Sequence, residues 1–200
     1  KQRVSIMLTL DVSKLNFTAT ECDFCGSKEF LSVRSVYFLG LNFQFVRCSQ
    51  CELVYQNPLL SSDSREHLYE TTEYWNHKHS SSAGKNFLNY YSYLEESEKR
   101  KKTDEFRIKW LTSRLPQGSR ILDLGCGDGL NVDLLRKSGY EAHGMDISSA
   151  MVVAAQEKYG VKIIQADAEK QWPFHEPFDA IVCYTISNFV HPSLVFKQIQ

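Results

Sequence analysis

The sequence predicts an α/β fold in which a parallel sheet follows a small cysteine-rich domain. Three features support this prediction. From Ser119 onward, short apolar runs alternate with helix-like segments, which is typical of parallel strands joined by right-handed crossovers. Glycines occupy every second position from 125 to 129, directly after the first apolar run. Two Cys-x-x-Cys pairs lie near the amino end.

The glycine-rich segment reads Ile121-Leu122-Asp123-Leu124-Gly125-Cys126-Gly127-Asp128-Gly129 and predicts a strand, a tight turn and a helix start. The helix is expected over Leu130 to Ser138. Glycine adopts positive φ without strain and leaves no side chain between the backbone and a ligand. The helix start offers unpaired N–H groups and a positive dipole end. We therefore expect an anionic or highly polar cofactor at this turn.

The spacing of the glycines narrows the choice of cofactor. A dinucleotide-binding turn reads G-x-G-x-x-G, which would place its last glycine where Leu130 stands. A phosphate-binding P-loop would need Gly-Lys-Ser/Thr at its end, and this turn has none. Asp123-x-Gly125-x-Gly127-x-Gly129 instead resembles the first motif of the class I S-adenosylmethionine (SAM) methyltransferases. This resemblance implies a Rossmann-like sheet with SAM at the turn.

Later segments extend the resemblance. A second strand is expected over Glu141 to Asp146, whose final carboxylate lies 17 residues past Gly129 and can accept both ribose hydroxyl protons. Ile147 offers an apolar face for the adenine. A third strand, Val161 to Gln165, leads to an acid that the family places on the adenine amino group, and Pro177 to Cys183 resembles the fourth motif. The expected cofactor residues are Asp123, Gly125, Cys126, Gly127, Gly129, Asp146, Ile147, Asp167 and Ala168. A Rossmann-like domain without SAM is the alternative.

Four of the six cysteines form two pairs, Cys22-x-x-Cys25 and Cys48-x-x-Cys51, separated by 22 residues. Two such knuckles provide four thiolates for a tetrahedral Zn²⁺ site. Disulfides, which a reducing compartment disfavours, and a redox pair, which needs no second pair, are the alternatives. The remaining cysteines, Cys126 and Cys183, are expected to be small buried or loop residues.

The chain divides into three predicted parts: a zinc ribbon over residues 1–60, a helical aromatic-rich segment over 61–116, and the SAM-binding half-domain over 117–200. In the ribbon, Phe30 to Tyr37 and Phe43 to Arg47 alternate as a hairpin does. In the middle part, a basic run at 99–102 is expected on a solvated helix face.

The middle part also contains a cluster of aromatic residues and a polar loop. The aromatic residues are expected either to pack ordinarily or to cover a cofactor or sugar ring, and the two loop histidines are expected to be solvated. These residues are Tyr74, Trp75, Phe87, Tyr90, Tyr91 and Tyr93, with His77 and His79.

A subset of the SAM methyltransferases, many acting on sugars, carries an amino-terminal zinc domain that the run Cys51 to Pro58 resembles. Glu52 stands where those proteins commonly have glycine. Many relatives carry Leu-Glu-His after the fourth strand, where this chain has Ser187-Asn188-Phe189. His191 could replace the missing histidine, but a turn histidine before proline is more often simply exposed, so no catalytic residue is assigned.

The resemblance implies strand order 3-2-1-4, the cofactor half of a seven-stranded sheet. An uncovered fourth strand would be a hydrophobic edge, so we expect the chain to be a fragment truncated after that strand. The net charge of −1 gives no general attraction to nucleic acid or membranes. No apolar run is long enough to span a membrane, and a cytoplasmic location is expected.

Two functions remain open. The first is a SAM-dependent methyltransferase acting on a small molecule such as a sugar or nucleotide-linked sugar, with bound Zn²⁺. The second is an RNA-binding or RNA-modifying methyltransferase whose zinc ribbon grips RNA. Nucleic-acid binding is disfavoured because only Lys28, Arg34 and Arg47 are basic between the cysteine pairs. The sequence gives no indication of the oligomeric state.

Overall fold

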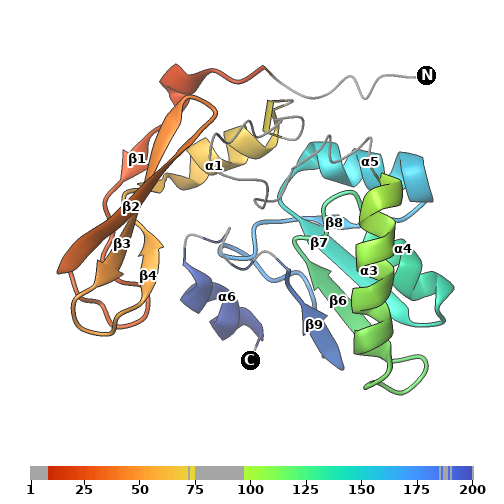
Figure 1. The fold of residues 1–200 in the computed structure, drawn as a ribbon. Helices are drawn as coiled ribbons and strands as arrows, with labels where there is room; N and C mark the ends of the chain where they lie inside the picture. The colour runs from red at the N-terminus through yellow and green to blue at the C-terminus, as the bar shows by residue number, and fades with distance from the viewer. Residues whose placement is uncertain are drawn as a thin grey trace.

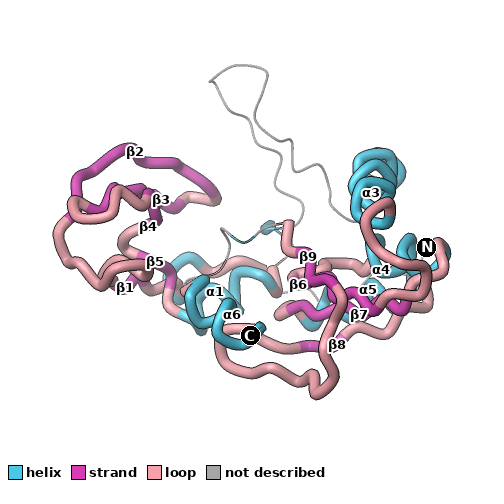
Figure 2. Tube along the Cα trace, turned by 90° about the horizontal axis from the view of Figure 1, so that it is seen from below, coloured by secondary structure: helices cyan, strands magenta, loops and turns pink. Residues whose placement is uncertain are grey.

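A computed structural model describes residues 9–71, 73–74, 97–184, 186, 189 and 191–199. It contains an amino-terminal β-domain and a parallel sheet, and helices α1 and α6 lie between them in both views (Figures 1 and 2). The amino-terminal part of the chain therefore faces one side of the parallel sheet.

The carboxy-terminal part is built on a four-stranded parallel sheet with strand order β8-β7-β6-β9. Its strands are β6 (Arg120–Leu124), β7 (Glu141–Asp146), β8 (Ile164–Gln165) and β9 (Ala180–Val182). The predicted order 3-2-1-4 and the Rossmann-like fold class are confirmed. The third strand was expected over five residues from Val161, but only its last two pair with β7.

Helices cover both faces of the sheet. They are α3 (Ser97–Thr112), α4 (Leu130–Lys137), α5 (Ser149–Tyr159) and α6 (Pro192–Ile199). Side chains alternate along β6, so Ile121 packs with α3, α4 and α5, whereas Leu122 packs with Val195 of α6. No helix in the described ranges is long and apolar enough to cross a membrane.

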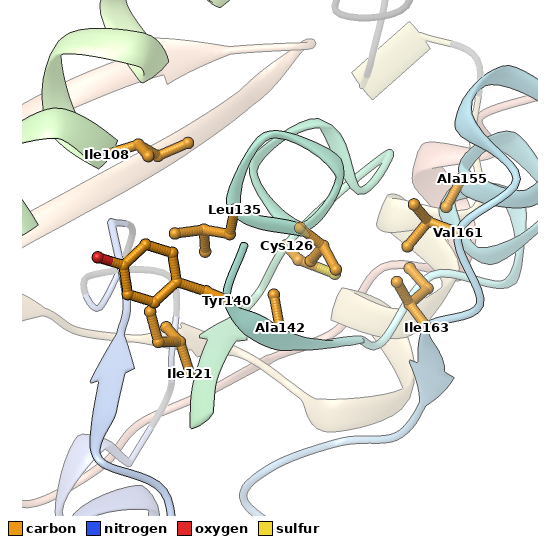
Figure 3. Packing of buried hydrophobic residues seen from close by; sticks show 10 residues of the cluster. Ile108, Ile121, Cys126, Leu135, Tyr140, Ala142, Ala155, Val161 and Ile163 are labelled. Carbon is orange, nitrogen blue, oxygen red and sulfur yellow. The ribbon is translucent and has the colours of Figure 1, made fainter. Parts of the chain in front are cut away.

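The cluster on the α4 face lies next to the glycine turn (Figure 3). It contains the buried side chain of Cys126, as expected for a small residue of the turn. A Cβ atom at Gly144 would lie 2.8 Å from Cys126 Sγ and 2.9 Å from Val132 Cγ2. The turn can therefore pack this closely on β7 because position 144 has no side chain.

The amino-terminal β-domain consists of two small antiparallel sheets, β2-β3-β4 and β1-β5. The predicted hairpin is present as β2 and β3. The elements are the 3-10 helix η1 (Val12–Lys14), β1 (Phe17–Thr18), β2 (Phe30–Phe38), β3 (Leu41–Cys48), β4 (Val54–Gln56), β5 (Leu59–Leu60) and α1 (Ser62–Tyr69).

Helix α1 packs against the β-domain. Leu68 of α1 is buried with Leu15, Leu41 and Leu60. Tyr74, from the predicted aromatic cluster, packs edge-on against Tyr69 at 4.8 Å between ring centroids. These contacts place α1 on the same apolar cluster as the ribbon, and the division into three parts stays a prediction.

Candidate cofactor site and metal centre

The glycine turn joins β6 to α4 at the carboxyl edge of the sheet. Gly125, Gly127 and Gly129 have φ values of 75°, 55° and 76°, the left-handed region that side chains disfavour. The N–H groups of Gly125 and Cys126 both donate to Met145 O, at 2.8 and 3.1 Å. The turn is thus bound by its own backbone to the neighbouring strand β7.

The three glycines do not have the same surroundings. Gly125 is exposed, whereas Gly127 and Gly129 are buried. A Cβ at Gly129 would lie 3.0 Å from Ala155 Cβ of α5. Gly129 therefore allows α5 to pack against the turn, and only the first glycine leaves the backbone open to a ligand.

Asp146 ends β7 and connects the turn to the next helix. Its Oδ2 accepts the Gly127 N–H at 2.7 Å, and its Oδ1 accepts the Ser148 N–H at 3.0 Å. Burial raises the pKa of Asp146, while these two N–H groups oppose the shift. Because a carboxylate has about four acceptor positions, two donors leave room for ligand hydroxyls.

Asp123 lies in β6 just before the turn and is 1% exposed. Its Oδ2 has no hydrogen-bond partner among the described residues. Burial raises the pKa of Asp123 to about 7, and the carboxylates of Asp104 and Asp146 add to this effect, while the side chain of Asn131 opposes it. The ionised form of Asp123 is thus incompletely stabilised by the protein.

Two further buried oxygens beside the turn also lack partners within the described ranges, namely Asp128 Oδ1 and Asn131 Oδ1. Buried polar atoms of this kind are rare in native proteins, and each costs on the order of 1–3 kcal/mol. A ligand with N–H donors and a positive charge would satisfy these atoms. These oxygen acceptors therefore fit a cofactor with a cationic amino-acid portion.

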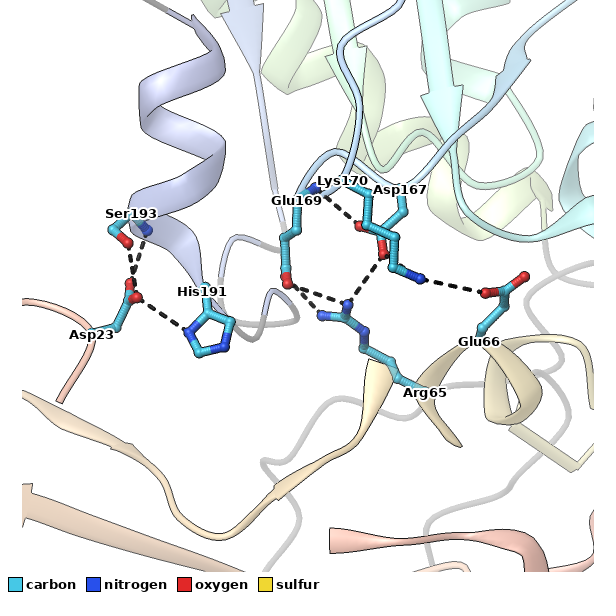
Figure 4. A network of polar contacts seen from close by, with 8 residues as sticks. All are labelled: Asp23, Arg65, Glu66, Asp167, Glu169, Lys170, His191 and Ser193. Atoms are coloured by element: carbon cyan, nitrogen blue, oxygen red, sulfur yellow. Dashed lines mark hydrogen bonds and ion pairs between the residues drawn. The ribbon is translucent and has the colours of Figure 1, made fainter. Parts of the chain in front are cut away.

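Asp167, the acid expected at the adenine amino group, makes an ion pair with an arginine of the amino-terminal part of the chain. Asp167 Oδ2 lies 3.5 Å from the guanidinium of Arg65, which comes from α1 (Figure 4). Arg65 also binds both carboxylate oxygens of Glu169, at 2.7 and 3.3 Å. The position of Asp167 is therefore set partly by the amino-terminal part of the chain.

The remaining predicted cofactor residues differ in their exposure. Ile147 is half-buried and follows Asp146 at the sheet edge. The side chains of Cys126 and Ala168 are buried in the two apolar clusters, one on each face of the sheet. These two residues could contact a ligand only through their backbone atoms, and their role stays a prediction.

Sequence reasoning missed an ion-pair cluster behind the turn. Asp128 is fully buried and lies 2.7 Å from the guanidinium of Arg100 in α3 and 3.4 Å from the Lys158 amine in α5. Arg100 was expected on a solvated face, and this was wrong because Asp128 draws its side chain inward. A single sequence offers no signal that pairs residues 28 positions apart.

A second missed group surrounds Asp123. The Arg107 guanidinium stacks on Tyr184 at 4.6 Å and bonds Asp104 at 3.2 Å. Burial and the nearby Asp123 raise the pKa of Tyr184 to about 12. Burial raises the pKa of Asp104 as well, while Arg107 opposes it. These residues place charged groups and an aromatic ring around Asp123.

The four predicted metal ligands meet in one cluster. Their sulfur atoms all lie within 4.8 Å of one another, with Cys22–Cys51 and Cys25–Cys48 at 3.5 Å. Four thiolates bound to Zn²⁺ at about 2.3 Å would be spaced about 3.8 Å apart. The two knuckles also match in their backbone bonds, since Gly26 N donates to Cys22 O and Glu52 N to Cys48 O. This geometry fits a tetrahedral metal site.

The four neighbouring thiols affect one another's ionisation. The backbone N–H of Cys51 is the main cause that lowers the pKa of Cys48 to about 6. For Cys51, the Leu53 N–H lowers the pKa, yet burial and the other three thiols outweigh it and raise the pKa to about 12. Four thiolates at this spacing need a cation to offset their repulsion.

Several residues of interest lie outside the described residues, and the structure does not place them. They are Trp75, Phe87, Tyr90, Tyr91, Tyr93, His77, His79, Ser187 and Asn188. Phe189 packs on the apolar cluster beneath α6. His191 is half-buried, and its Nδ1 lies 3.3 Å from Asp23 Oδ1.

Comparison with known proteins matches the sheet domain. Residues 121–200 match the family described as "Methyltransferase domain". The chain is 37% identical over 87 residues to the putative methyltransferase YqeM of Bacillus subtilis (strain 168), covering 41% of this chain and 35% of that protein. It is 28% identical over 76 residues to the dTDP-4-amino-2,3,4,6-tetradeoxy-D-glucose N,N-dimethyltransferase of Saccharopolyspora spinosa, covering 38% and 30%.

Solved structures with related folds include two methyltransferases. The sugar N-methyltransferase KedS8 from Streptoalloteichus sp ATCC 53650 aligns with a TM-score of 0.46 and 22% identity, covering 60% of this chain and 52% of that one. The magnesium protoporphyrin IX methyltransferase ChlM from Synechocystis PCC 6803 with bound SAH aligns with a TM-score of 0.44 and 21% identity, covering 58% and 57%. The chain spans about a third of the length of the two sequence relatives named above.

Proposed function

We propose that this chain carries the cofactor-binding part of a SAM-dependent methyltransferase that acts on a small-molecule acceptor. The observation that carries the proposal is the buried carboxylate of Asp123, whose Oδ2 has no partner among the described residues and which stands beside the glycine turn. A carboxyl group with a pKa near 7 gains most from a cationic ligand. The match of residues 121–200 to a methyltransferase domain supports the same activity.

In this proposal each acid has a separate task. Asp123 binds the charged amino-acid end of SAM, Asp146 accepts the ribose hydroxyls, and Asp167 lies at the adenine side with Ile147. When bound, SAM supplies an activated methyl group on a good leaving group. The protein then has to align the acceptor and exclude water.

The proposal includes a structural zinc ion held by Cys22, Cys25, Cys48 and Cys51. The support is the four-sulfur cluster with its two matching knuckles. A site with four protein ligands leaves no open position for substrate, so its task is to hold the fold. The zinc would stabilise the β-domain and thereby the helix α1 that reaches the cofactor site.

For the acceptor we propose a sugar or a nucleotide-linked sugar. Support comes from the Saccharopolyspora spinosa relative, whose name gives a dTDP-linked amino sugar as its substrate. The RNA-directed alternative has little support in the ribbon, because three basic residues lie between the cysteine pairs and Glu29 offsets one of them. RNA binding at physiological salt draws on several such charges.

A calorimetric titration with SAM tests the cofactor assignment. We expect the wild type to bind, and Asp123→Asn and Asp146→Asn to bind at least about tenfold more weakly, as each loses a charge-assisted contact. Asp179→Asn is the matched control, because Asp179 bonds Arg120 N at the opposite edge of the sheet. Absence of binding by folded wild-type protein would contradict the proposal.

A further inference from the structure

Within the described residues, the amino-terminal part of the chain is bound to the parallel sheet domain at three places, all at the carboxyl edge of the sheet. The contacts are Glu70 with the Ser149 N–H at 2.6 Å, Arg65 with Glu169 at 2.7 Å, and Asp23 with the Ser193 N–H at 2.8 Å. Figure 4 shows the second and third. Among the three amino-terminal residues that make these contacts, Asp23 alone lies within a cysteine knuckle, between Cys22 and Cys25.

Asp23 supplies what the start of α6 lacks. The helix begins with Pro192, which has no N–H, and carries no acid in its first turn. Asp23 Oδ2 accepts the Ser193 N–H, and its Oδ1 accepts the Ser193 hydroxyl at 2.8 Å. An acid at this place satisfies an unpaired donor and the positive dipole end of the helix. A side chain 170 positions away in sequence thus caps α6.

The position of Asp23 depends on its knuckle. Cys22 N donates to Ser27 O and Gly26 N to Cys22 O, both at 2.8 Å, so the knuckle is a single tight loop. Both cysteines of this loop belong to the four-sulfur cluster. When both are bound to one ion, the loop between them has little freedom left.

Helix α6 packs on the strand that leads into the glycine turn. Its Val195 is completely buried with Leu122 and Leu124 of β6. Asp123 lies between these two leucines in sequence, and the next strand, β9, pairs with it through Val182. The hold on α6 therefore bears on the strand that carries Asp123.

We propose that Asp23 is a positioning residue through which metal binding at the four cysteines holds the start of α6 against the sheet that carries the proposed cofactor site. This inference rests on the proposed zinc site. Because coupling between two sites is reciprocal, loosening α6 must also weaken the hold on the metal. A purely local structural role for Asp23 would not have this second consequence.

The test measures both directions on the zinc-loaded full chain. Zinc release to a chromophoric chelator is timed, and hydrogen exchange of residues 192–199 is recorded before and after zinc removal. The variants are Asp23→Ala, Ser193→Ala and Glu21→Ala. Glu21 is the control, because it is an exposed acid beside the same knuckle that makes no hydrogen bond or ion pair with α6 within the described ranges.

We expect zinc to leave Asp23→Ala about fivefold faster than wild type, with Ser193→Ala shifted less in the same direction and Glu21→Ala unchanged. Removing zinc should speed exchange in α6 of the wild type about fivefold. In Asp23→Ala that exchange should already be fast and insensitive to zinc. Exchange in β6 and β7 should stay slow throughout.

The proposal would be overturned if Asp23→Ala and Ser193→Ala both released zinc, and exchanged the amide hydrogens of α6, at the same rates as the wild type. Ser193 is remote from the cysteines in sequence, so its variant keeps the test valid if Asp23→Ala fails to fold. A wild type that binds zinc but shows no change in α6 on zinc removal would overturn the role of Asp23 alone. A folded wild type that binds no zinc would overturn the metal assignment together with this inference.

Discussion

The parallel sheet and the ribbon sheet β2-β3-β4 contain similar side chains but bury them very differently. In the parallel sheet, Leu122 of β6 is 0% exposed, while in the ribbon Leu31 of β2 is 58% exposed. Only the last part of β2 is even half-buried. In the ribbon the buried side chains near the knuckles are Cys22, Cys48 and Val46. The sheet domain thus has two apolar clusters of its own, whereas the ribbon combines a sulfur cluster with one small apolar cluster that it shares with α1.

This difference implies two sources of stability. Each large apolar side chain buried in the sheet domain contributes about 1.5–3 kcal/mol. The ribbon buries too few such groups, and small domains of this kind depend on metal binding for their folding free energy. The predictions below test whether the two regions can be destabilised separately, in order of expected effect.

Metal removal should have the largest effect. Zinc bound to four cysteines contributes on the order of 10 kcal/mol to folding of small domains. We expect a chelator, or Cys48→Ser, to raise hydrogen exchange throughout β2 and β3 while β6 and β7 stay protected. Unfolding of neither region would show that the ribbon does not depend on the metal, and unfolding of both together would show that the two regions cannot be destabilised separately.

A substitution in the apolar core should instead destabilise the sheet domain and leave the ribbon folded. Leu122→Ala removes a fully buried side chain and should lower the free energy of unfolding of the sheet domain by about 2–5 kcal/mol. Leu31→Ala, at an exposed site, should change it by less than about 0.5 kcal/mol. Denaturant unfolding, with the bound zinc measured at each denaturant concentration, gives both changes. The proposed difference between the two regions is contradicted if Leu122→Ala releases zinc at denaturant concentrations where the parallel sheet is still folded.

The smallest expected effect concerns the second knuckle. Glu52 has φ of 66°, while Gly26 occupies the equivalent place in the first knuckle with φ of 74°. A side chain in this conformation costs about 1 kcal/mol. We therefore expect Glu52→Gly to slow zinc release modestly, and Gly26→Ala, which meets no atom within 4 Å, to speed it by a similar factor. Equal rates of zinc release from the wild type, Glu52→Gly and Gly26→Ala would show that backbone strain in the knuckles does not affect metal binding.

The sequence was sufficient to predict much of this organisation. Alternating strands and helices indicated a parallel sheet, and the resemblance to the class I SAM methyltransferases implied its strand order. The Cys-x-x-Cys spacing gave the sulfur cluster, since such knuckles are local in sequence. The unusual Glu52 was also visible, and its positive φ explains why glycine is common there.

Contacts between distant residues could not be predicted in this way. Asp128 with Arg100, Arg65 with Glu169, and Asp23 with Ser193 each join segments that only the folded chain brings together. Charge patterns assign such residues to solvated faces, because pairing across the fold leaves no periodic signal. The sequence therefore predicted the strand, glycine turn and helix start around Gly125, while the distant contacts that support this turn were missed.

The two acids at the turn provide the most direct test of the proposed function. Asp146 accepts two backbone N–H groups, whereas Asp123 is left with a buried oxygen that has no partner in the described part of the chain. Burial raises the pKa of Asp123 from 3.8 to about 7. A cationic ligand favours the ionised form, so below about pH 7 binding must first remove a proton and weakens as pH falls.

The decisive measurement is the affinity for SAM at pH 6.0 and 7.5 in the wild type and in Asp123→Asn. With a pKa of about 7, we expect wild-type affinity to be roughly tenfold lower at pH 6.0. In Asp123→Asn, affinity should be low at both pH values and nearly independent of pH. Equal wild-type affinities at the two pH values, or an Asp123→Asn variant that binds as tightly as the wild type, would contradict the role of Asp123 in SAM recognition.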